Sequence, residues 1–274
     1  MNQTHKAELL RRLHSGPEVL VLPNVWDAAS ARVVEAEGFP VVATSSSGCA
    51  AVLGYADGQQ ISRSEMMFII AKIVQSVQVP VTADVEAGYD GLEQTALDVI
   101  AAGAVGLNFE DMIGNNLVPL ENQLQRLRKL RAVADESGLP LVINARTDIY
   151  LAEDGAAATR FERTVERLNA FRAAGADCLF VPGVRDAKTI GRLVSAIDGP
   201  VNVLAQPGSP SIAEMKALGV ARVSLGGGPS RVAMGAVRRL VRSLRDHGTF
   251  AGLADEAIPA QEMQALLDRK TFSE

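Results

Sequence analysis

The stretch TADVEAGYDG, residues 82–91, places two carboxylates, Asp84 and Glu86, directly after a short apolar run. A third acid, Glu110, ends the next apolar run along the chain. Acids brought together at neighbouring strand ends repel one another, and their pKa values rise unless a cation lies among them. A hard divalent cation with oxygen ligands removes that repulsion, and Mg2+ typically binds one or two carboxylates and keeps several waters. The spacing therefore predicts a Mg2+ site, which Mn2+ could also occupy, at Asp84, Glu86 and Glu110.

A basic side chain, Arg146, ends the fifth apolar run. Its guanidinium can hold a carboxylate through two parallel hydrogen bonds, so a metal and Arg146 together would bind an anionic substrate. The alternative is a buried salt-bridge network, in which Arg146 pairs with Asp84, Glu86 and Glu110 and ties the strands together. The spacing leaves both interpretations open, and neither specifies a reaction.

Other polar groups follow the same strand ends. Ser45, Ser46 and Ser47 precede Gly48 and could offer hydroxyl and backbone N–H groups to an anion, although a plain polar loop fits equally well. Asn202, on the seventh apolar run, is a further candidate for substrate binding. The three histidines lie near the two chain ends, and the two cysteines form no CxxC pair. The sequence therefore argues against a histidine base, a Ser-His-Asp triad and a thiolate metal site.

The elements that must position these groups are eight short apolar runs, each followed by a helical pattern. Runs of this length without polar alternation are typical of parallel strands that helices cover on both faces. The runs are VLVL from Val19, VVAT from Val41, VPVTAD from Val79, GLNFE from Gly106, LVINAR from Leu141, CLFVP from Cys178, VNVLA from Val201 and RVSLG from Arg222.

The entries to these runs alternate along the chain. Runs one, three, five and seven are entered through a proline, whereas runs two, four, six and eight follow a glycine. Both residues mark the ends of helices. Alternation over eight units predicts a (β/α)8 barrel, because alternate strands of a barrel fill different core layers, whereas an open doubly wound sheet rarely runs to eight such units. Barrels carry their sites at the carboxyl ends of the strands, where the acids and Arg146 stand.

The chain is expected to form one barrel domain, residues 1–274, because no Pro/Gly/Ser-rich linker or charge block divides it. Residues 248–274 exceed what a closed barrel needs and contain one more amphipathic pattern. They are expected to form a C-terminal arm that packs on another subunit or lies on the surface as a simple helix.

Composition excludes several classes of protein. The 274 residues carry a net charge of −5 with both signs scattered, which argues against a nucleic-acid partner. No apolar run approaches the roughly 20 residues that cross a bilayer, and the polar N-terminus does not look like a secretion signal. A cytoplasmic protein without a nucleic-acid or membrane partner is therefore expected.

Five motifs, taken together and in order, carry a family resemblance: NVWDAASARVVEAEGFP, LGYADG, TADVEAGYDG, NFED and INARTD. From about Asn24 to Leu225 the chain resembles the isocitrate lyase/phosphoenolpyruvate mutase superfamily. The resemblance implies a (β/α)8 barrel, usually a homodimer or homotetramer whose last barrel helix is exchanged between neighbours. It also implies Mg2+-dependent making or breaking of C–C or P–C bonds next to a 2-oxo acid, through an enolate-like intermediate.

The resemblance also implies roles for single residues. Asp57, in the Leu-Gly-x-x-Asp motif, would act in the substrate pocket or position a metal-bound water, and Glu110 would be both a metal ligand and a catalytic residue, as Arg146 would be. The substrate carboxylate would lie against Arg146 and the loop of Ser45, Ser46 and Ser47. The metal motif of the family falls on Asp84, Glu86, Gly88 and Tyr89, with Glu86 in place of a second aspartate.

The chain departs from the family in two places. The lyases carry a Lys-x-Cys-Gly-His loop after strand four, where this chain has EDMIGNNLVPLENQ, which indicates a phosphonomutase-like branch. The histidine that the mutase has after strand six is replaced by Val181-Pro182-Gly183. Residues 112–119 are expected to form a lid that excludes water, although a merely exposed turn is the alternative. Isocitrate cleavage is expected to be slow or absent.

We therefore expect a Mg2+-dependent lyase or decarboxylase that cleaves the C–C bond beside the carbonyl or hydroxyl carbon of a small 2-oxo or 2-hydroxy acid. Chemistry on a P–C bond, of the phosphonopyruvate mutase or hydrolase type, is the enzymatic alternative. A 2-oxo acid-binding protein with vestigial activity is an alternative from another class, because the acid groups of the lyases and the mutase are missing.

Overall fold

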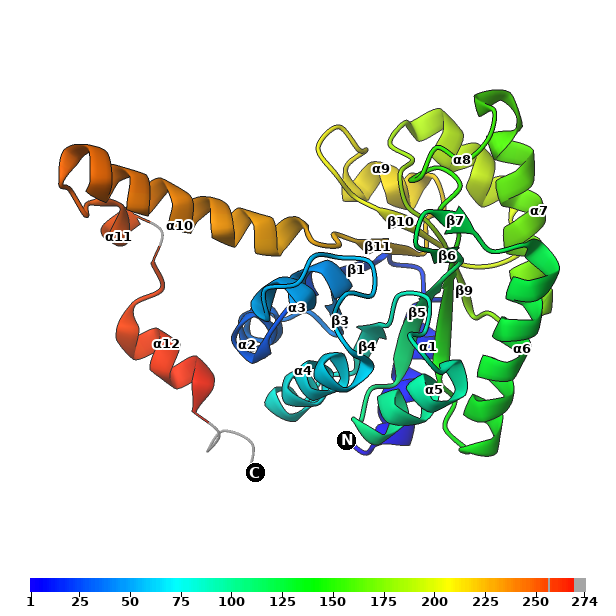
Figure 1. Ribbon diagram of the computed structural model, residues 1–274, viewed down its shortest axis with the longest axis horizontal. Helices are drawn as coiled ribbons and strands as arrows, with labels where there is room; N and C mark the ends of the chain where they lie inside the picture. The colour runs from blue at the N-terminus through cyan, green and yellow to red at the C-terminus, as the bar shows by residue number, and fades with distance from the viewer. Residues whose placement is uncertain (256, 269–274) are drawn as a thin grey trace.

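The computed structural model describes residues 1–255 and 257–268, and its centre is a barrel of parallel strands ringed by helices (Figure 1). The strand order is β1-β11-β10-β9-β8-β5-β4-β3-β2. These strands are β1 Leu20–Leu22, β2 Asn24–Val25, β3 Val42–Thr44, β4 Val81–Asp84, β5 Gly106–Glu110, β8 Val142–Arg146, β9 Cys178–Val181, β10 Val201–Leu204 and β11 Arg222–Ser224. Each of the eight predicted runs contains a barrel strand, and the predicted (β/α)8 fold is confirmed.

The first predicted run contains β1, and a second short strand, β2, follows it after a proline. Pro23, which has no N–H to donate, separates β1 from β2. β1 pairs with β11 through Leu20 and Arg222, whereas β2 pairs with β3 through Asn24 and Ala43. Because a single residue links the two ends of the sheet order, the sheet closes on itself at this point.

Helices between the strands cover the outside of the barrel (Figure 1). They are α2 Ala28–Ala36, α4 Arg63–Ser76, α5 Leu92–Ala101, α6 Leu120–Glu136, α7 Arg160–Ala173, α8 Ala187–Ala196 and α9 Ile212–Ala217. Serine caps start α4 and α9: Ser62 and Ser211 each form a capping box with a glutamate three residues later. No helix in the described ranges combines the length and apolar character needed to cross a bilayer.

One further helix, α1 (Gln3–Leu13), packs on the barrel at the start of β5. Gly106 makes room for it, since a Cβ atom at this position would lie 2.7 Å from Leu10 Cδ2. Leu10 is fully buried, and Gln3 Nε2 donates hydrogen bonds to the carbonyl oxygens of Ile100 and Ala104. α1 therefore approaches the barrel from the ends opposite to those where Asp84 and Glu110 stand.

Three small elements lie in the loops that follow the strands. The short helix α3, Ser46–Val52, follows β3, and a 3-10 helix, Ala157–Thr159, precedes α7. Within residues 112–119, the expected lid, β6 (Met112–Ile113) and β7 (Asn116–Leu117) form an antiparallel hairpin. The N–H of Val118 donates to the carbonyl oxygen of Asp111 at 2.8 Å, which closes the base of the hairpin. Movement of this hairpin as a lid stays a prediction.

The chain leaves the barrel with α10, Gly228–His247, which extends away from it in Figure 1. None of its residues is buried, and five apolar side chains on it are exposed: Val232, Met234, Val237, Val241 and Leu244. Two helices follow, α11 (Gly252–Asp255) and α12 (Ala260–Leu267), and α12 returns to α2, where Arg32 Nε donates to the Leu266 carbonyl at 2.5 Å. Of the expected arm, residues 256 and 269–274 lie outside the described residues. Helix exchange within an oligomer would cover the apolar side chains of α10, and it stays a prediction.

The inside of the barrel is polar for a fold whose interior is usually filled by branched apolar side chains. The buried polar residues on its strands include Thr44, Thr82, Asn108, Asn144, Asn202 and Arg222. Buried polar groups are stable where they bond to one another, so this interior is held by specific hydrogen bonds as well as by packing. Several of these bonds lead toward the carboxyl ends of the strands.

Candidate active site at the carboxyl ends of the strands

A pocket of about 300 Å3 opens at the carboxyl ends of the barrel strands. Its walls combine polar residues from β2 to β8 with a glycine-rich loop that follows β11. Of the residues predicted for the site, the pocket is lined by Ser45, Ser46, Ser47, Asp57, Asp84 and Arg146. The structure therefore brings most of the predicted groups to one place.

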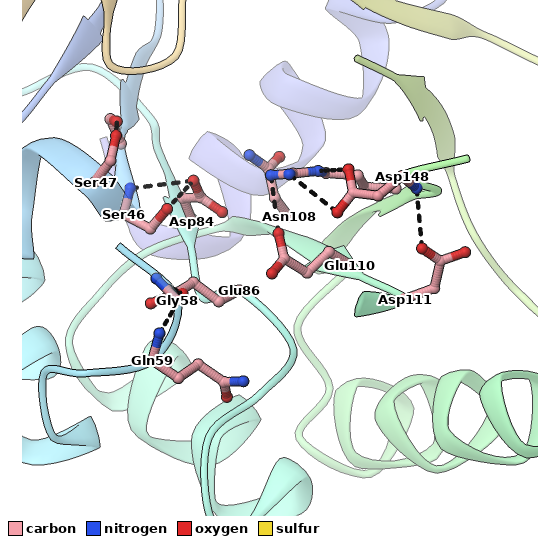
Figure 2. Close-up of polar contacts among 12 residues, drawn as sticks. Ser46, Ser47, Gly58, Gln59, Asp84, Glu86, Asn108, Glu110, Asp111 and Asp148 are labelled. Atoms are coloured by element: carbon pink, nitrogen blue, oxygen red, sulfur yellow. Dashed lines mark hydrogen bonds and ion pairs between the residues drawn. The ribbon is translucent and has the colours of Figure 1, made fainter. Parts of the chain in front are cut away.

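Asp84 ends β4 and is 8% exposed. Its Oδ2 atom accepts hydrogen bonds from the N–H of Ser46 at 3.1 Å and from Ser46 Oγ at 2.9 Å (Figure 2). The Asp84 N–H in turn donates to Thr44 Oγ1 at 2.8 Å. Oδ1 accepts no hydrogen bond from the described residues. The side chain is thus fixed through one oxygen and offers the other to the pocket.

Glu86 binds the backbone that carries Asp57. Its Oε2 atom accepts from the N–H groups of Gly58 at 3.0 Å and Gln59 at 2.6 Å (Figure 2). Its Oε1 accepts from the Tyr89 hydroxyl at 3.2 Å. Burial raises the pKa of Glu86 to about 7, with further contributions from the charges of Asp84 and Asp57. Burial and Asp84 likewise raise the pKa of Asp57. In the described ranges, none of these three acids has an ion pair.

We expect Glu86→Gln to stabilise the metal-free protein at alkaline pH. The pKa of Glu86 is about 7 in the folded protein against 4.5 ordinarily, so its contribution to stability falls as pH rises from 4.5 to 7. Glutamine keeps an acceptor for the backbone N–H groups without the charge. In EDTA at pH 8 its free energy of unfolding should exceed that of the unaltered protein by up to about 3 kcal/mol.

Urea unfolding of both proteins at pH 4.5 and pH 8 measures this difference. At pH 4.5 the two should differ little, and added Mg2+ should remove the advantage of Glu86→Gln at pH 8. The pKa of His14 is lowered to about 4 and gives an opposite pH trend, but it cancels because both proteins contain it. A Glu86→Gln protein that is less stable at pH 8 would contradict the electrostatic interpretation.

Arg146 is held between two acids. Its Nη1 lies 2.8 Å from Glu110 Oε2, while Nε and Nη2 donate to Asp148 Oδ1 and Oδ2 at 2.7 and 3.1 Å. Burial raises the pKa of Glu110 well above its ordinary value, and the charge of Arg146 opposes that rise. The salt-bridge network considered from the sequence thus exists in part: within the described residues, Arg146 pairs with Glu110 and Asp148 but with neither Asp84 nor Glu86.

The three serines and Asn202 occupy different positions. Ser45 caps α3, where its Oγ accepts from the N–H of Gly48 at 3.3 Å and lies 3.1 Å from Ser47 Oγ. All three serines line the pocket. Asn202 is fully buried, and its Oδ1 accepts a 3.4 Å hydrogen bond from Ser224 Oγ. The pocket is lined by Ser224 and not by Asn202, so the structure does not bring Asn202 to the site.

Sequence reasoning passed over several residues that line the pocket, among them Asn108, Leu151, Phe180, Gln206 and Arg231. Asn108 could have been found, because it lies two residues before Glu110 and alternate residues of a strand share a face. Leu151 and Gln206 come from loops, and Arg231 from the first turn of α10. No pattern in the sequence places such residues over a barrel.

The donors in the pocket fit a hydrated hard cation. Among the described residues no group of three or more His, Cys, Asp or Glu side chains is spaced to hold one ion. Mg2+ does not require such a group, because it commonly binds one or two carboxylates and keeps several waters. Asp84 has one carboxylate oxygen available for a cation. Asp57 and Glu86 lie close enough to Asp84 for their charges to interact, so they make the potential around that oxygen more negative. Glu110 is instead engaged by Arg146.

Neither cysteine is placed to act in the pocket. Cys49 and Cys178 are buried, and burial raises the pKa of each thiol to about 12. The pocket lining contains no histidine and no cysteine among the described residues. Acid or base chemistry at this site therefore depends on carboxyl and hydroxyl groups.

Comparison with known proteins identifies the family. The family model for phosphoenolpyruvate phosphomutase matches residues 10–245. A protein from Burkholderia cenocepacia J2315, solved as a candidate lyase/mutase, is 35% identical with a TM-score of 0.89, and the match covers 96% of this chain and 95% of that one. Oxaloacetate acetylhydrolase, solved with the inhibitor 3,3-difluorooxalacetate, is 26% identical with a TM-score of 0.86, and the match covers 97% and 94%.

A curated relative adds a named activity. Oxaloacetate decarboxylase of Bradyrhizobium diazoefficiens is 27% identical over 275 residues, which cover 94% of this chain and 93% of the relative. The match to the family model includes every barrel strand described above. The chain is therefore an enzyme of the isocitrate lyase/phosphoenolpyruvate mutase superfamily, a group of lyases and mutases.

Proposed function

We propose that this enzyme is a Mg2+-dependent lyase or decarboxylase, which cleaves the C–C bond next to the carbonyl or hydroxyl carbon of a small 2-oxo or 2-hydroxy acid. The observation that carries the proposal is the distribution of charge around one pocket. Asp57 and Asp84, which line the pocket, and Glu86, which binds the backbone beside Asp57, have no ion pair among the described residues, whereas Arg146 on the same pocket is paired with two acids. Such an acidic cluster calls for a cation, and a cation beside hydroxyl groups and a guanidinium suits an anionic substrate.

Different residues would bind the cation and the substrate carboxylate. Asp84 would hold the cation, with Asp57 and Glu86 adding negative potential around it. A bound Mg2+ would polarise the 2-oxo group and stabilise the negative charge that develops on its oxygen. Arg146 and the hydroxyl groups of Ser46 and Ser47 would bind the substrate carboxylate and so orient the bond to be broken.

Proton transfer in this pocket is assigned to a carboxyl group. Asp57 is our candidate, because it lines the pocket and lies close enough to Asp84 for their charges to interact. The hairpin of β6 and β7 directly follows Glu110 and Asp111, and it would exclude water if it closes over the substrate. Without a cysteine or histidine in that hairpin, isocitrate is expected to be a poor substrate.

C–C cleavage is among the activities of the named relatives, as is the phosphomutase reaction. An oxaloacetate decarboxylase and an oxaloacetate acetylhydrolase each resemble this chain over nearly its whole length. Loss of CO2 from such an acid leaves the electron pair on the carbon beside the carbonyl, and a cation on the carbonyl oxygen would stabilise that charge. The similarity to phosphoenolpyruvate phosphomutase makes P–C chemistry the alternative that a test must distinguish.

A ligand screen with product detection tests the proposal. The melting temperature is measured with oxaloacetate, 2-oxoglutarate, isocitrate, methylisocitrate and phosphonopyruvate, each with and without Mg2+. We expect at least one 2-oxo acid to raise the melting temperature only with Mg2+, and its C–C bond to be cleaved on incubation. Conversion of phosphonopyruvate alone would reassign the enzyme to P–C chemistry. Stabilisation without any turnover would indicate a binding protein.

A further inference from the structure

A positively charged side chain, Arg222, is buried inside the barrel and does not line the pocket. Arg222, on β11, is 0% exposed and makes no ion pair with any carboxylate in the described residues. Its Nη2 donates to Asn108 Oδ1 at 3.1 Å, and its Nη1 lies 3.4 Å from His14 Nε2. A buried guanidinium is costly unless its donors are satisfied, so these two acceptors are important for holding it.

The contact with His14 fixes the state of the imidazole. Arginine carries only donors, so His14 Nε2 must be the unprotonated, accepting nitrogen. His14 Nδ1 then carries the hydrogen and donates to the Leu10 carbonyl at 2.8 Å. Burial, together with the charge of Arg222, lowers the pKa of His14 to about 4, which agrees with a neutral ring. Arg222 is therefore held from the α1 side by a neutral acceptor.

The same argument fixes the amide of Asn108. Its Oδ1 accepts from Arg222 Nη2 at 3.1 Å and from Asn144 Nδ2 at 2.8 Å. A flipped amide would place N–H groups against a guanidinium, which has no acceptor, so the oxygen must face Arg222. The Nδ2 group of Asn108 consequently points away from this buried pair of donors.

The free amide group of Asn108 belongs to the pocket. Asn108 is 5% exposed and lines the pocket, and its Nδ2 makes no hydrogen bond with the described residues. Asn108 is the register partner of Asp84 and lies two residues before Glu110 on the same strand. In Figure 2 it lies between Asp84 and Glu110. An N–H group cannot bind a metal ion, and the oxygen is already occupied. The partner that remains is an acceptor inside the pocket: water in the free enzyme and a ligand oxygen in the complex.

We propose that Asn108 is a substrate-binding residue, whose Nδ2 donates a hydrogen bond to an oxygen of the bound 2-oxo acid, and that Arg222 is the positioning residue that fixes this donor. The inference rests on the proposed function. Besides fixing the orientation, a cation on the oxygen side of an amide polarises it and makes its N–H groups stronger donors. The polar interior thereby connects α1, through His14 and Arg222, to the floor of the pocket.

Oxalate, a small planar dianion, is the probe, and its dissociation constant is measured by calorimetry in saturating Mg2+. We expect Asn108→Ala to raise the dissociation constant of oxalate at least about 10-fold, which corresponds to about 1.4 kcal/mol. Arg222→Met should raise this constant by less, because the Asn108 amide remains but can turn. In the Asn108→Ala background, Arg222→Met should add less than about a 2-fold change, since it acts through Asn108. Mg2+ affinity should change little in all three.

Two further variants control for folding. Thr82→Val removes a buried hydroxyl from the same interior without touching Asn108 or the pocket, and its oxalate affinity should be unchanged. Asn108→Asp keeps an oxygen for Arg222 and should stay folded, but it offers the pocket only acceptors, so oxalate binding should fall further than in Asn108→Ala.

The outcomes separate this inference from the proposed function. Normal oxalate binding by both Asn108 variants would overturn the donor role of Asn108 while leaving the proposed function in place. Additive effects of Asn108→Ala and Arg222→Met would overturn the positioning role of Arg222. Failure of the unaltered protein to bind oxalate in Mg2+ would contradict the proposed function and the donor role with it.

Discussion

An Asp84→Asn protein is expected to bind Mg2+ at least about 100-fold more weakly than the unaltered protein and to lose Mg2+-dependent turnover. The change removes the carboxylate that offers a free oxygen to the pocket, and loss of even an indirect partner of a metal typically costs 10–100-fold in affinity. The fold should survive, because the asparagine oxygen can still accept from the N–H and hydroxyl of Ser46. Calorimetric titration with Mg2+, together with a melting curve, measures both effects.

The control for this variant is Asp90→Asn. It makes the same charge change six residues further along the same loop, where the side chain is 78% exposed and pairs with Arg63 at the surface. Its Mg2+ affinity and turnover should be close to those of the unaltered protein. If Asp84→Asn lowered the melting temperature strongly and left Mg2+ binding unchanged, the acid would have a structural role and the cation site would be wrong.

An Asp111→Asn protein is expected to lose about 3–5 kcal/mol of its free energy of unfolding. Asp111 is fully buried, with Oδ2 2.5 Å from Arg167 Nε and Oδ1 accepting from the N–H of Asp148 at 3.0 Å. The neutral amide would leave Arg167 buried without a charged partner, and it would loosen the backbone at Asp148, which holds Arg146. Urea unfolding measures the loss, and turnover should fall with it.

The double replacement of Asp111 by leucine and Arg167 by methionine is the control. Removing both charges of a buried pair is far less costly than removing one. The double variant should therefore recover most of the stability that Asp111→Asn loses. If the double variant were as unstable as the single one, packing around Asp111 and not its charge would hold this part of the barrel together.

The barrel could be predicted because its signals are local. Prolines and glycines at helix exits and apolar runs in the strands recur eight times, and each reflects a backbone constraint that acts within a few residues. The split of the first strand at Pro23 could not be predicted. The departure of α10 from the barrel could be expected only from the family resemblance, because the sequence of an amphipathic helix shows that it needs a partner surface but not which surface.

The site was predictable only at the level of strand ends. Asp84, Asp57, Arg146 and the serines were expected near one another, and they line one pocket. Which inward side chains reach the mouth of a barrel depends on register and strand tilt, so the sequence did not show that Asn108 lines the pocket and Asn202 does not. Pairing between side chains is less predictable still. Arg146 pairs with Glu110 and also with Asp148, two residues further along the chain.

The single-residue link between β1 and β2 has a consequence for synthesis on the ribosome. β1 completes its hydrogen bonds only with β11, which is made last among the barrel strands. A nascent chain that has not yet reached Arg222 leaves β1 and β10 as open sheet edges, and open edges recruit strands from other chains. β11, which closes the barrel, also carries the buried Arg222. Closure of the barrel and organisation of the pocket floor therefore occur together, late in the life of the nascent chain.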